Sequence, residues 1–280
     1  MVYSMADLIQ GEKFWGIADF IYTPDTPDMY DWNLLKNTFD IDKLFDGAIV
    51  YTHTMYLCSL FEKLLECSSQ IILISHNSDD NVDTYPVPMC VSMWYAQNID
   101  PFNKKVSPRL QSIPIGLENN RWYPGLNKKE KMLAKMHEER NYKNLLYINH
   151  NIANNPEERL PPYKILGNKS WVTAECLKNG NRFDSYLDNI YNHKFVLCPR
   201  GHGIDTHRTW ECLYMGVIPI EKRNTNNQFY TDLPICFVDD WEEITENFLL
   251  SEYEKIINFG KWNMDKLKFS YWHEKIMKHE

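Results

Sequence analysis

The chain has 280 residues, of which 44% are apolar and 24% are charged, a composition that is typical of globular domains and excludes a disordered chain. Its formal net charge of -8 at pH 7 argues against a nucleic-acid partner, because that affinity comes largely from Lys and Arg side chains that meet phosphates. The seven cysteines are irregularly spaced without a Cys-x-x-Cys pair, which indicates reduced thiols rather than disulfides or zinc ligands.

The N-terminus lacks the basic and apolar segments of a signal peptide, and no apolar run approaches the roughly 18 residues of a membrane span. We therefore expect a soluble, cytoplasmic protein without a membrane span.

Short apolar runs in the first half alternate with polar and helix-like segments, as in α/β domains. Residues 54–67 have a helical apolar spacing and lie between two such runs, which predicts a strand–helix–strand parallel crossover. The expected N-terminal domain covers residues 1–142. Its expected strands are 15–22, 47–52, 70–75, 91–96 and 112–117.

The second half repeats this alternation after a charged, helix-prone connector at 128–143. The expected strands are 144–149, 170–174, 194–199, 217–220 and 235–238, and the expected helices are 156–166, 182–192, 206–215 and 241–257. Two such units predict two doubly wound, Rossmann-like domains, the second covering residues 143–260. We expect the helical segment 261–280 to pack back onto the N-terminal domain. Such folds bind ligands outside the carboxyl ends of their strands, so polar residues that follow a strand are site candidates.

The segment FVLCPRGHGIDTHRTWECLYMGVIPI, residues 195–220, places a glycine-containing turn between an expected strand and an expected helix. Gly201 and Gly203 allow a backbone to come close to a ligand. Asp205 or Thr206 is a suitable N-cap, and the helix that follows offers free N–H groups to an anion. This turn is therefore a candidate phosphate site.

Charged side chains strengthen that interpretation. Arg200 and Arg208 offer forked donors that suit phosphate oxygens. Glu211 lies on the same helix face as Arg208, where a carboxylate suits vicinal hydroxyls such as those of a ribose. The competing interpretation is a surface pair of Arg208 with Glu211 behind an ordinary glycine turn.

The same segment resembles the signature of exostosin-like glycosyltransferases: an apolar strand, CPRG, a spaced Gly and Asp, an Arg, a helix with Glu, and G-x-I-P. The matching residues are Cys198, Pro199, Arg200, Gly201, Gly203, Asp205, Arg208, Glu211, Gly216, Ile218 and Pro219. The stretches 73–77, 94–98 and 113–117 also resemble exostosin-like proteins of large DNA viruses, among them capsid-glycan xylosyltransferases.

The resemblance implies a GT-B fold, in which two Rossmann-like domains face each other across a cleft and the second holds the sugar nucleotide. It implies that Arg200 contacts the diphosphate, that Glu211 contacts the ribose, and that transfer inverts the anomeric centre. A UDP-sugar such as UDP-xylose is then the expected donor, and a glycan hydroxyl such as that of fucose on a viral capsid N-glycan is the expected acceptor. For a viral chain the compartment would be the host cytoplasm.

An inverting transfer needs a base that takes the proton of the acceptor hydroxyl. Four residues of the first half qualify by their place near a strand. We favour Asp79 or His76 in the segment ISHNSDDN, and keep His53 and Asp19 as alternatives. A turn built from Asn, Ser and Asp side chains is the competing interpretation of that segment.

Further donor contacts are expected from Asn149 at the end of the expected strand 144–149, from Arg159, and from Glu221 after VIPI. No clear metal-binding Asp-x-Asp motif is present, so we expect no metal and no cofactor besides the sugar nucleotide. Two alternatives stay open. One is another nucleotide-sugar enzyme, although G-x-G-x-x-G is absent after the first strand. The other is a non-catalytic glycan- or nucleotide-binding protein of the same fold.

Overall fold

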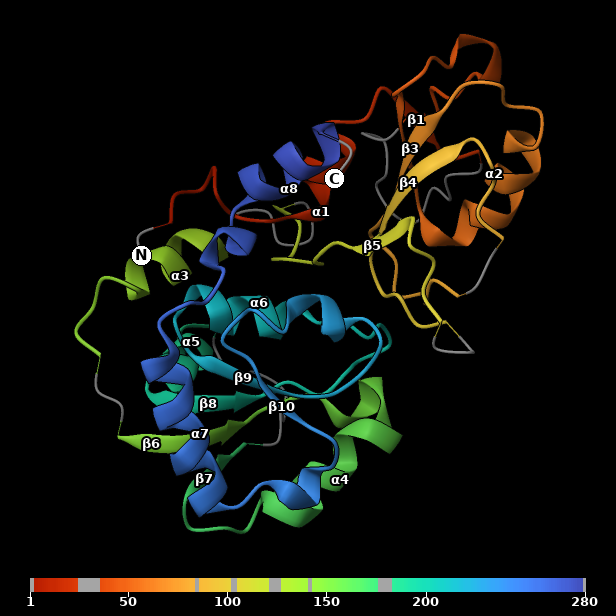
Figure 1. The fold of residues 1–280 in the computed structure, drawn as a ribbon. Coiled ribbons are helices and arrows are strands. Elements are labelled where there is room, and N and C mark those ends of the chain that lie inside the picture. The colour runs from red at the N-terminus through yellow and green to blue at the C-terminus, as the bar shows by residue number, and fades with distance from the viewer. Residues whose placement is uncertain are drawn as a thin grey trace.

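The structure is a computed structural model that describes residues 3–24, 36–83, 86–101, 105–120, 127–140, 143–175 and 183–278. Within these ranges the chain forms two five-stranded parallel sheets, each in its own half, with helices packed against them (Figure 1). The predicted α/β class with two parallel sheets is therefore confirmed.

The first sheet contains its five strands in chain order, β1-β2-β3-β4-β5, and every pair is parallel. These strands are β1 (Phe20–Tyr22), β2 (Ile49–Thr52), β3 (Ile71–Ser75), β4 (Val91–Ala96) and β5 (Leu110–Ser112). The helix α2 (Leu57–Leu64) connects β2 to β3, which confirms the predicted strand–helix–strand unit. The sheet does not reverse its strand order, so the expectation of a doubly wound first domain is wrong for the described strands.

Two strand boundaries in this half also differ from the prediction. The helix α1 (Gly11–Trp15) occupies the start of the expected strand 15–22, and β1 begins only at Phe20. At the other edge, β5 ends at Ser112, and the expected strand 112–117 continues as a non-strand segment in which the N–H of Leu117 donates to the carbonyl of Ile9.

Apolar side chains cover both faces of the first sheet because neighbouring strand residues point to opposite sides. Val50 and Leu73 belong to the cluster that packs on α2. Tyr51 and Ile74 belong to the other cluster, which includes Phe14 of α1.

The second sheet has the order β7-β6-β8-β9-β10, again with every pair parallel. Its strands are β6 (Asn144–Ile148), β7 (Val172–Ala174), β8 (His193–Leu197), β9 (Ile218–Lys222) and β10 (Cys236–Val238). The chain moves outward from β6 to β7 and then returns to place β8 on the other side of β6. This sheet is therefore doubly wound, as predicted, with its reversal between β6 and β8.

Helices cover both faces of the second sheet. The apolar cluster on one face includes residues of α4 (Pro156–Leu166) and α7 (Glu246–Phe259). The cluster on the other face includes residues of α5 (Phe183–Tyr191) and α6 (His207–Tyr214). The helix α3 (Lys128–Lys135) packs beside α5, where Nζ of Lys131 lies 2.8 Å from Oδ1 of Asp184.

The last helix, α8 (Phe269–Met277), lies beside α1 and against the first sheet (Figure 1). The hydroxyl of Tyr95 in β4 donates to the carbonyl of Lys275 at 3.1 Å. The same buried cluster contains Ile74 of β3, Trp272 of α8 and Trp210 of α6, so one apolar core runs from the first sheet to the second half. This shared core fixes the two halves relative to each other. No helix within the described ranges is both long and apolar enough to cross a membrane.

Candidate functional site

Polar residues gather where β6 and β8 end, at the point where the strand order of the second sheet reverses. Asn149 and His150 follow β6, and Arg200 follows β8 after Pro199. Ligands of open α/β sheets bind at such a reversal, because the loops from the two strands diverge to opposite faces and leave a crevice between them. The topology therefore places the candidate phosphate turn where a ligand is expected.

The turn after β8 depends on two glycines. A Cβ atom on Gly201 would lie 2.8 Å from Nη2 of Arg159, and one on Gly203 would lie 2.8 Å from Nδ2 of Asn98. Real Cβ atoms essentially never come that close to a neighbour. Within the described residues, Gly201 and Gly203 therefore make room for two protein side chains, those of Arg159 and Asn98.

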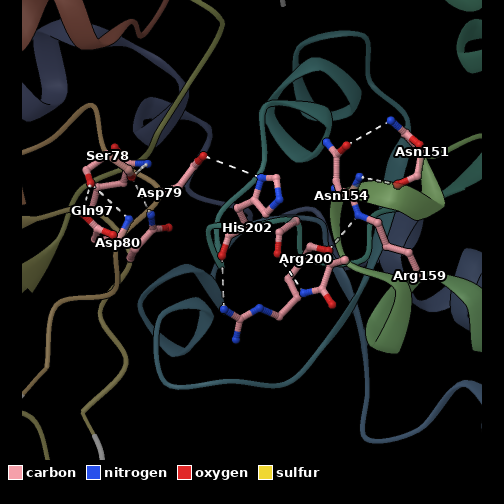
Figure 2. Close-up of polar contacts among 12 residues, drawn as sticks. Ser78, Asp79, Asp80, Gln97, Asn151, Asn154, Arg159, Arg200 and His202 are labelled. Atoms are coloured by element: carbon pink, nitrogen blue, oxygen red, sulfur yellow. Dashed lines mark hydrogen bonds and ion pairs between the residues drawn. The ribbon is translucent and has the colours of Figure 1, made fainter. Parts of the chain in front are cut away.

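Arg159 of α4 holds the loops after β6 and β8 together (Figure 2). Its Nε donates to the carbonyl of Arg200 at 2.8 Å, and its Nη1 donates to the carbonyl of Asn151 at 3.0 Å. Asn155 adds a third link, because its Nδ2 donates to the carbonyl of Gly201 at 2.9 Å. We expected Arg159 to reach a phosphate, but the structure commits two of its donors to shaping the site.

Four buried polar atoms at this edge of the sheet have no hydrogen-bond partner within the described part of the chain. They are Oδ1 of Asn149, Nδ1 of His150, Nε of Arg200 and Nη1 of Arg208. Asn149 and His150 are 0% and 1% exposed. Nearly all buried polar atoms in folded proteins are hydrogen-bonded, so several unpartnered ones at one place indicate that something else satisfies them.

These four atoms divide into donors and acceptors. Burial, with the charges of Arg208 and Arg159, lowers the pKa of His150 to about 3, so its imidazole is neutral near pH 7. Its Nε2 lies 2.8 Å from the carbonyl of Arg159 and therefore carries the proton, which leaves Nδ1 as an acceptor. With Oδ1 of Asn149, the site offers two acceptors beside the two guanidinium donors.

Arg208 and Glu211 lie on one face of α6, as their spacing predicts, and they share Tyr186 of α5 as a neighbour. The guanidinium carbon of Arg208 lies 5.2 Å from the centre of the Tyr186 ring, a cation–π contact. The Tyr186 hydroxyl donates to Oε2 of Glu211. Tyr186 thus orients both groups that were expected to bind a nucleotide.

Asp205 and Thr206 differ from the ligand contacts that we expected. Oδ2 of Asp205 accepts from the backbone N–H of Ile115 at 2.8 Å, and Oδ1 accepts from Nε1 of Trp210 at 2.8 Å. Burial raises the pKa of Asp205 to about 7. Thr206 stands at the N-cap position of α6, but its side chain caps no backbone amide. Asp205 therefore ties the turn to the first half instead of facing a ligand.

Glu221, near the end of β9, is engaged as well. Its Oε1 accepts from the hydroxyl of Thr209, and its Oε2 accepts from Nδ2 of Asn227 at 3.0 Å. Burial raises the pKa of this carboxyl group. Glu221 nevertheless lines a cavity that also contains Arg200.

Asn98, which follows β4, links the two halves beside the turn through hydrogen bonds of its side chain. Its backbone φ of 59° is left-handed, a conformation that Asn tolerates better than most residues. Its Oδ1 accepts from the N–H of Asp205 at 2.9 Å, and its Nδ2 donates to the carbonyl of Ser78 at 2.9 Å. The side chain of Asn98 therefore links the turn after β8 to the loop after β3.

That loop brings Asp79 to the turn (Figure 2). Oδ2 of Asp79 lies 4.0 Å from Nδ1 of His202, and both side chains are exposed. Close by, Oδ2 of Asp100 lies 3.9 Å from Nη1 of Arg200. Carboxylates of the first half thus face basic groups of the second, and Asp79 is the candidate base that the structure brings to the turn after β8.

His76 and His53, by contrast, are buried in the first half. His76 is 0% exposed, its Nε2 lies 2.9 Å from the carbonyl of Pro114, and its ring packs 4.9 Å from that of Phe14. Burial lowers its pKa to about 4. His53 is 2% exposed, with Nδ1 at 3.1 Å from the carbonyl of His76. Neither imidazole reaches solvent, so the structure contradicts both as bases for an external hydroxyl.

Asp19 lies at the wrong end of the sheet. It precedes β1, and its Oδ2 accepts from the N–H of Ile49 at the start of β2 at 2.9 Å. The expected strand 15–22 would have placed Asp19 within the strand. Because β1 begins at Phe20, its carboxylate instead lies at the amino end, away from the loops that carry Asp79.

The buried state of His76 predicts a pH-dependent stability. The unfolded imidazole binds a proton near pH 6.5, whereas burial lowers the folded pKa to about 4. The stability it contributes is therefore present above pH 6.5 and lost as the pH falls toward 4. Between pH 7 and pH 5 the loss should be about 2 kcal/mol.

A His76→Gln variant removes this titration, and its amide can still donate to the carbonyl of Pro114. Urea unfolding of both proteins at pH 7 and pH 5 measures the effect. We expect the wild type to lose more stability than the variant on acidification. Equal losses in the two proteins would contradict a neutral, buried His76.

Three of these residues were missed, and they differ in the signal that the sequence carries. His150 and Asn98 both come just after expected strands, where the rule for open α/β sheets looks for ligands. Tyr186 lies within a helix, and nothing in its neighbourhood distinguishes it from a core aromatic.

Within the described residues, no group of three or more His, Cys, Asp or Glu side chains is placed to hold a metal ion. The chain matches no protein-family model, and a search of curated proteins found no match either.

Proposed function

We propose that the protein is an inverting glycosyltransferase that moves a sugar from a UDP-sugar to a glycan hydroxyl. The observation that carries the proposal is the set of four buried, unpartnered atoms where β6 and β8 end. The guanidinium donors of Arg200 and Arg208 suit a diphosphate. The acceptors on Asn149 and His150 suit the hydroxyl or N–H groups of a nucleoside.

The proposed reaction needs no metal, because fixed positive charge is available for the leaving group. The acceptor hydroxyl loses its proton to a base, its oxygen bonds to the anomeric carbon, and the bond from that carbon to the diphosphate breaks. Arg200 and Arg208 would stabilise the charge that develops on the diphosphate. His150 is neutral near pH 7 and carries its proton on Nε2, so its Nδ1 accepts a hydrogen bond there and donates none.

Asp79 is the proposed base. It is exposed, it lies on the half opposite Arg200, and the loop that carries it is joined to the phosphate turn through Asn98. On this proposal the two halves form a GT-B arrangement, with the acceptor held mainly by residues 1–142 and the donor by residues 143–260. Xylose as the sugar and fucose as the acceptor are the choices that the motif resemblance favours.

Calorimetry in the presence of a chelator tests the proposal. UDP, GDP and ADP are titrated into the protein, and we expect UDP to bind. Incubation of the protein with a panel of UDP- and GDP-sugars should then release free nucleotide from one of them. Binding without release or transfer would favour a non-catalytic nucleotide-binding protein, and failure of every nucleotide to bind would remove the proposal.

A further inference from the structure

A cavity of about 140 Å³ lies beside Arg200, at the carboxyl ends of β8 and β9. Its lining includes Glu158 at the start of α4, Ile204 after β8, Glu221 of β9 and Trp241 after β10. Glu211, the expected ribose contact, is not among the lining residues. The cavity is therefore a separate compartment next to the group that we assign to the diphosphate.

The volume suits a single ring. A protein cavity of roughly 150 Å³ holds one benzene molecule. A space of this size therefore matches one six-membered ring better than a purine or a ring that carries an N-acetyl group.

Two of the residues that line this cavity carry a buried N–H group that has no hydrogen-bond partner among the described residues. Trp241 is 2% exposed, yet its Nε1 has no hydrogen bond within the described ranges. The same holds for Nε of Arg200. A buried indole N–H normally finds an acceptor, so its lack of one indicates that a ligand oxygen completes it.

Acceptors are also available. The carboxylate of Glu158 makes no hydrogen bond to any other described residue, and Glu221 receives one bond on each oxygen although a carboxylate can accept about four. Hydroxyl groups both donate and accept, so a ring bearing several of them satisfies carboxylates and N–H donors together.

We infer that this cavity is the subsite for the monosaccharide ring of the donor, and that it takes an unsubstituted pentose or hexose. The inference rests on the proposed function, because the ring is bonded to the phosphate that Arg200 would hold. Trp241 donates to a ring hydroxyl, and Glu158 and Glu221 accept from others. Ile204 supplies an apolar wall for the C–H face of the ring.

Calorimetry with UDP, UDP-xylose and UDP-N-acetylglucosamine tests the inference on the wild type and on Trp241→Phe. The wild type should bind UDP-xylose more tightly than UDP, and UDP-N-acetylglucosamine no more tightly than UDP. Trp241→Phe keeps an aromatic ring but loses the N–H. It should weaken binding of UDP-xylose about threefold to tenfold, the effect of one hydrogen bond, and leave UDP unchanged.

Two further variants serve as a control and as an alternative for this test. Trp262→Phe removes an indole N–H that donates to the carbonyl of Ile256 at 2.9 Å, away from the cavity, and should leave both affinities unchanged. If Trp241→Phe unfolds, Glu158→Gln should show the same selective loss. Equal weakening of UDP and UDP-xylose, or equal wild-type affinities for the two, would overturn the inference while the proposed function stands. No binding of UDP would overturn both.

Discussion

Replacing Arg200 by alanine is expected to weaken binding of UDP about tenfold to a hundredfold, the effect of losing hydrogen bonds to a charged group. The free N–H groups of Arg200 are the reason. Among the described residues its Nε is buried without a partner, and its terminal nitrogens make only long contacts, 3.9 Å to Asp100 and 3.5 Å to the carbonyl of His202. A side chain held so loosely by the protein keeps its donors for a ligand. Calorimetry measures the change directly.

Two variants separate charge from geometry. Arg200→Lys keeps the charge but loses the fork, and should recover only part of the affinity. Lys194→Ala makes the same change in net charge on β8 itself, but at the amino end of the strand, and should leave the affinity within about twofold. Wild-type affinity in Arg200→Ala would show that the turn after β8 serves only the fold.

The position of Arg200 was predictable from the sequence because it depends on local pattern. The apolar run FVLC reads as a buried strand, and Pro199 with the glycines ends it. The structure places β8 at His193–Leu197 and α6 at His207–Tyr214, close to the expected ranges. Once the strand is known, the rule about carboxyl ends gives the site.

The strand order of the first sheet was not predictable in the same way. The connections after β3 and β4 form no helix within the described residues, so no crossover returns the chain to the other side of β1. Whether a loop places the next strand beside the previous one or farther away in the sheet depends on packing between segments. The spacing of apolar residues does not report that packing.

The contacts between the two halves could not be predicted from the sequence either. Asp205 accepts from the backbone of Ile115, and Asn98 accepts from the backbone of Asp205, although these partners are separated by 90 and 107 positions in the chain. From the sequence, the carboxylate of Asp205 in a glycine-containing turn suggests a ligand contact or a helix cap. Only the packing of the two halves shows that its oxygens already accept hydrogen bonds from other protein groups.

These contacts have a consequence for the proposed chemistry. A continuous apolar core and the hydrogen bonds of the Asn98 side chain hold the loop of Asp79 against the turn of Arg200. The proposed base and the proposed diphosphate contact therefore keep a fixed relation to each other. Transfer depends on that relation, because the hydroxyl must meet the anomeric carbon on the face opposite the leaving group.

Replacing Asp79 by asparagine should lower kcat for transfer by a factor of about 10² to 10⁴, the usual contribution of a general base, while UDP binds as before. Asparagine matches the side chain in size and keeps a polar atom near His202, but it cannot take a proton. Steady-state transfer at saturating concentrations of the donor identified by the nucleotide-release panel measures kcat, and calorimetry measures UDP binding.

Asp80→Asn is the matched control, because Asp80 is the next residue of the same exposed loop. Within the described ranges its Oδ2 accepts only from the hydroxyl of Ser78, at 3.0 Å. Its turnover should stay within about threefold of the wild type. Full turnover in Asp79→Asn would reject Asp79 as the base. A loss of transfer in His202→Asn would then identify the imidazole beside it, which lies on the turn after β8 and faces the same space.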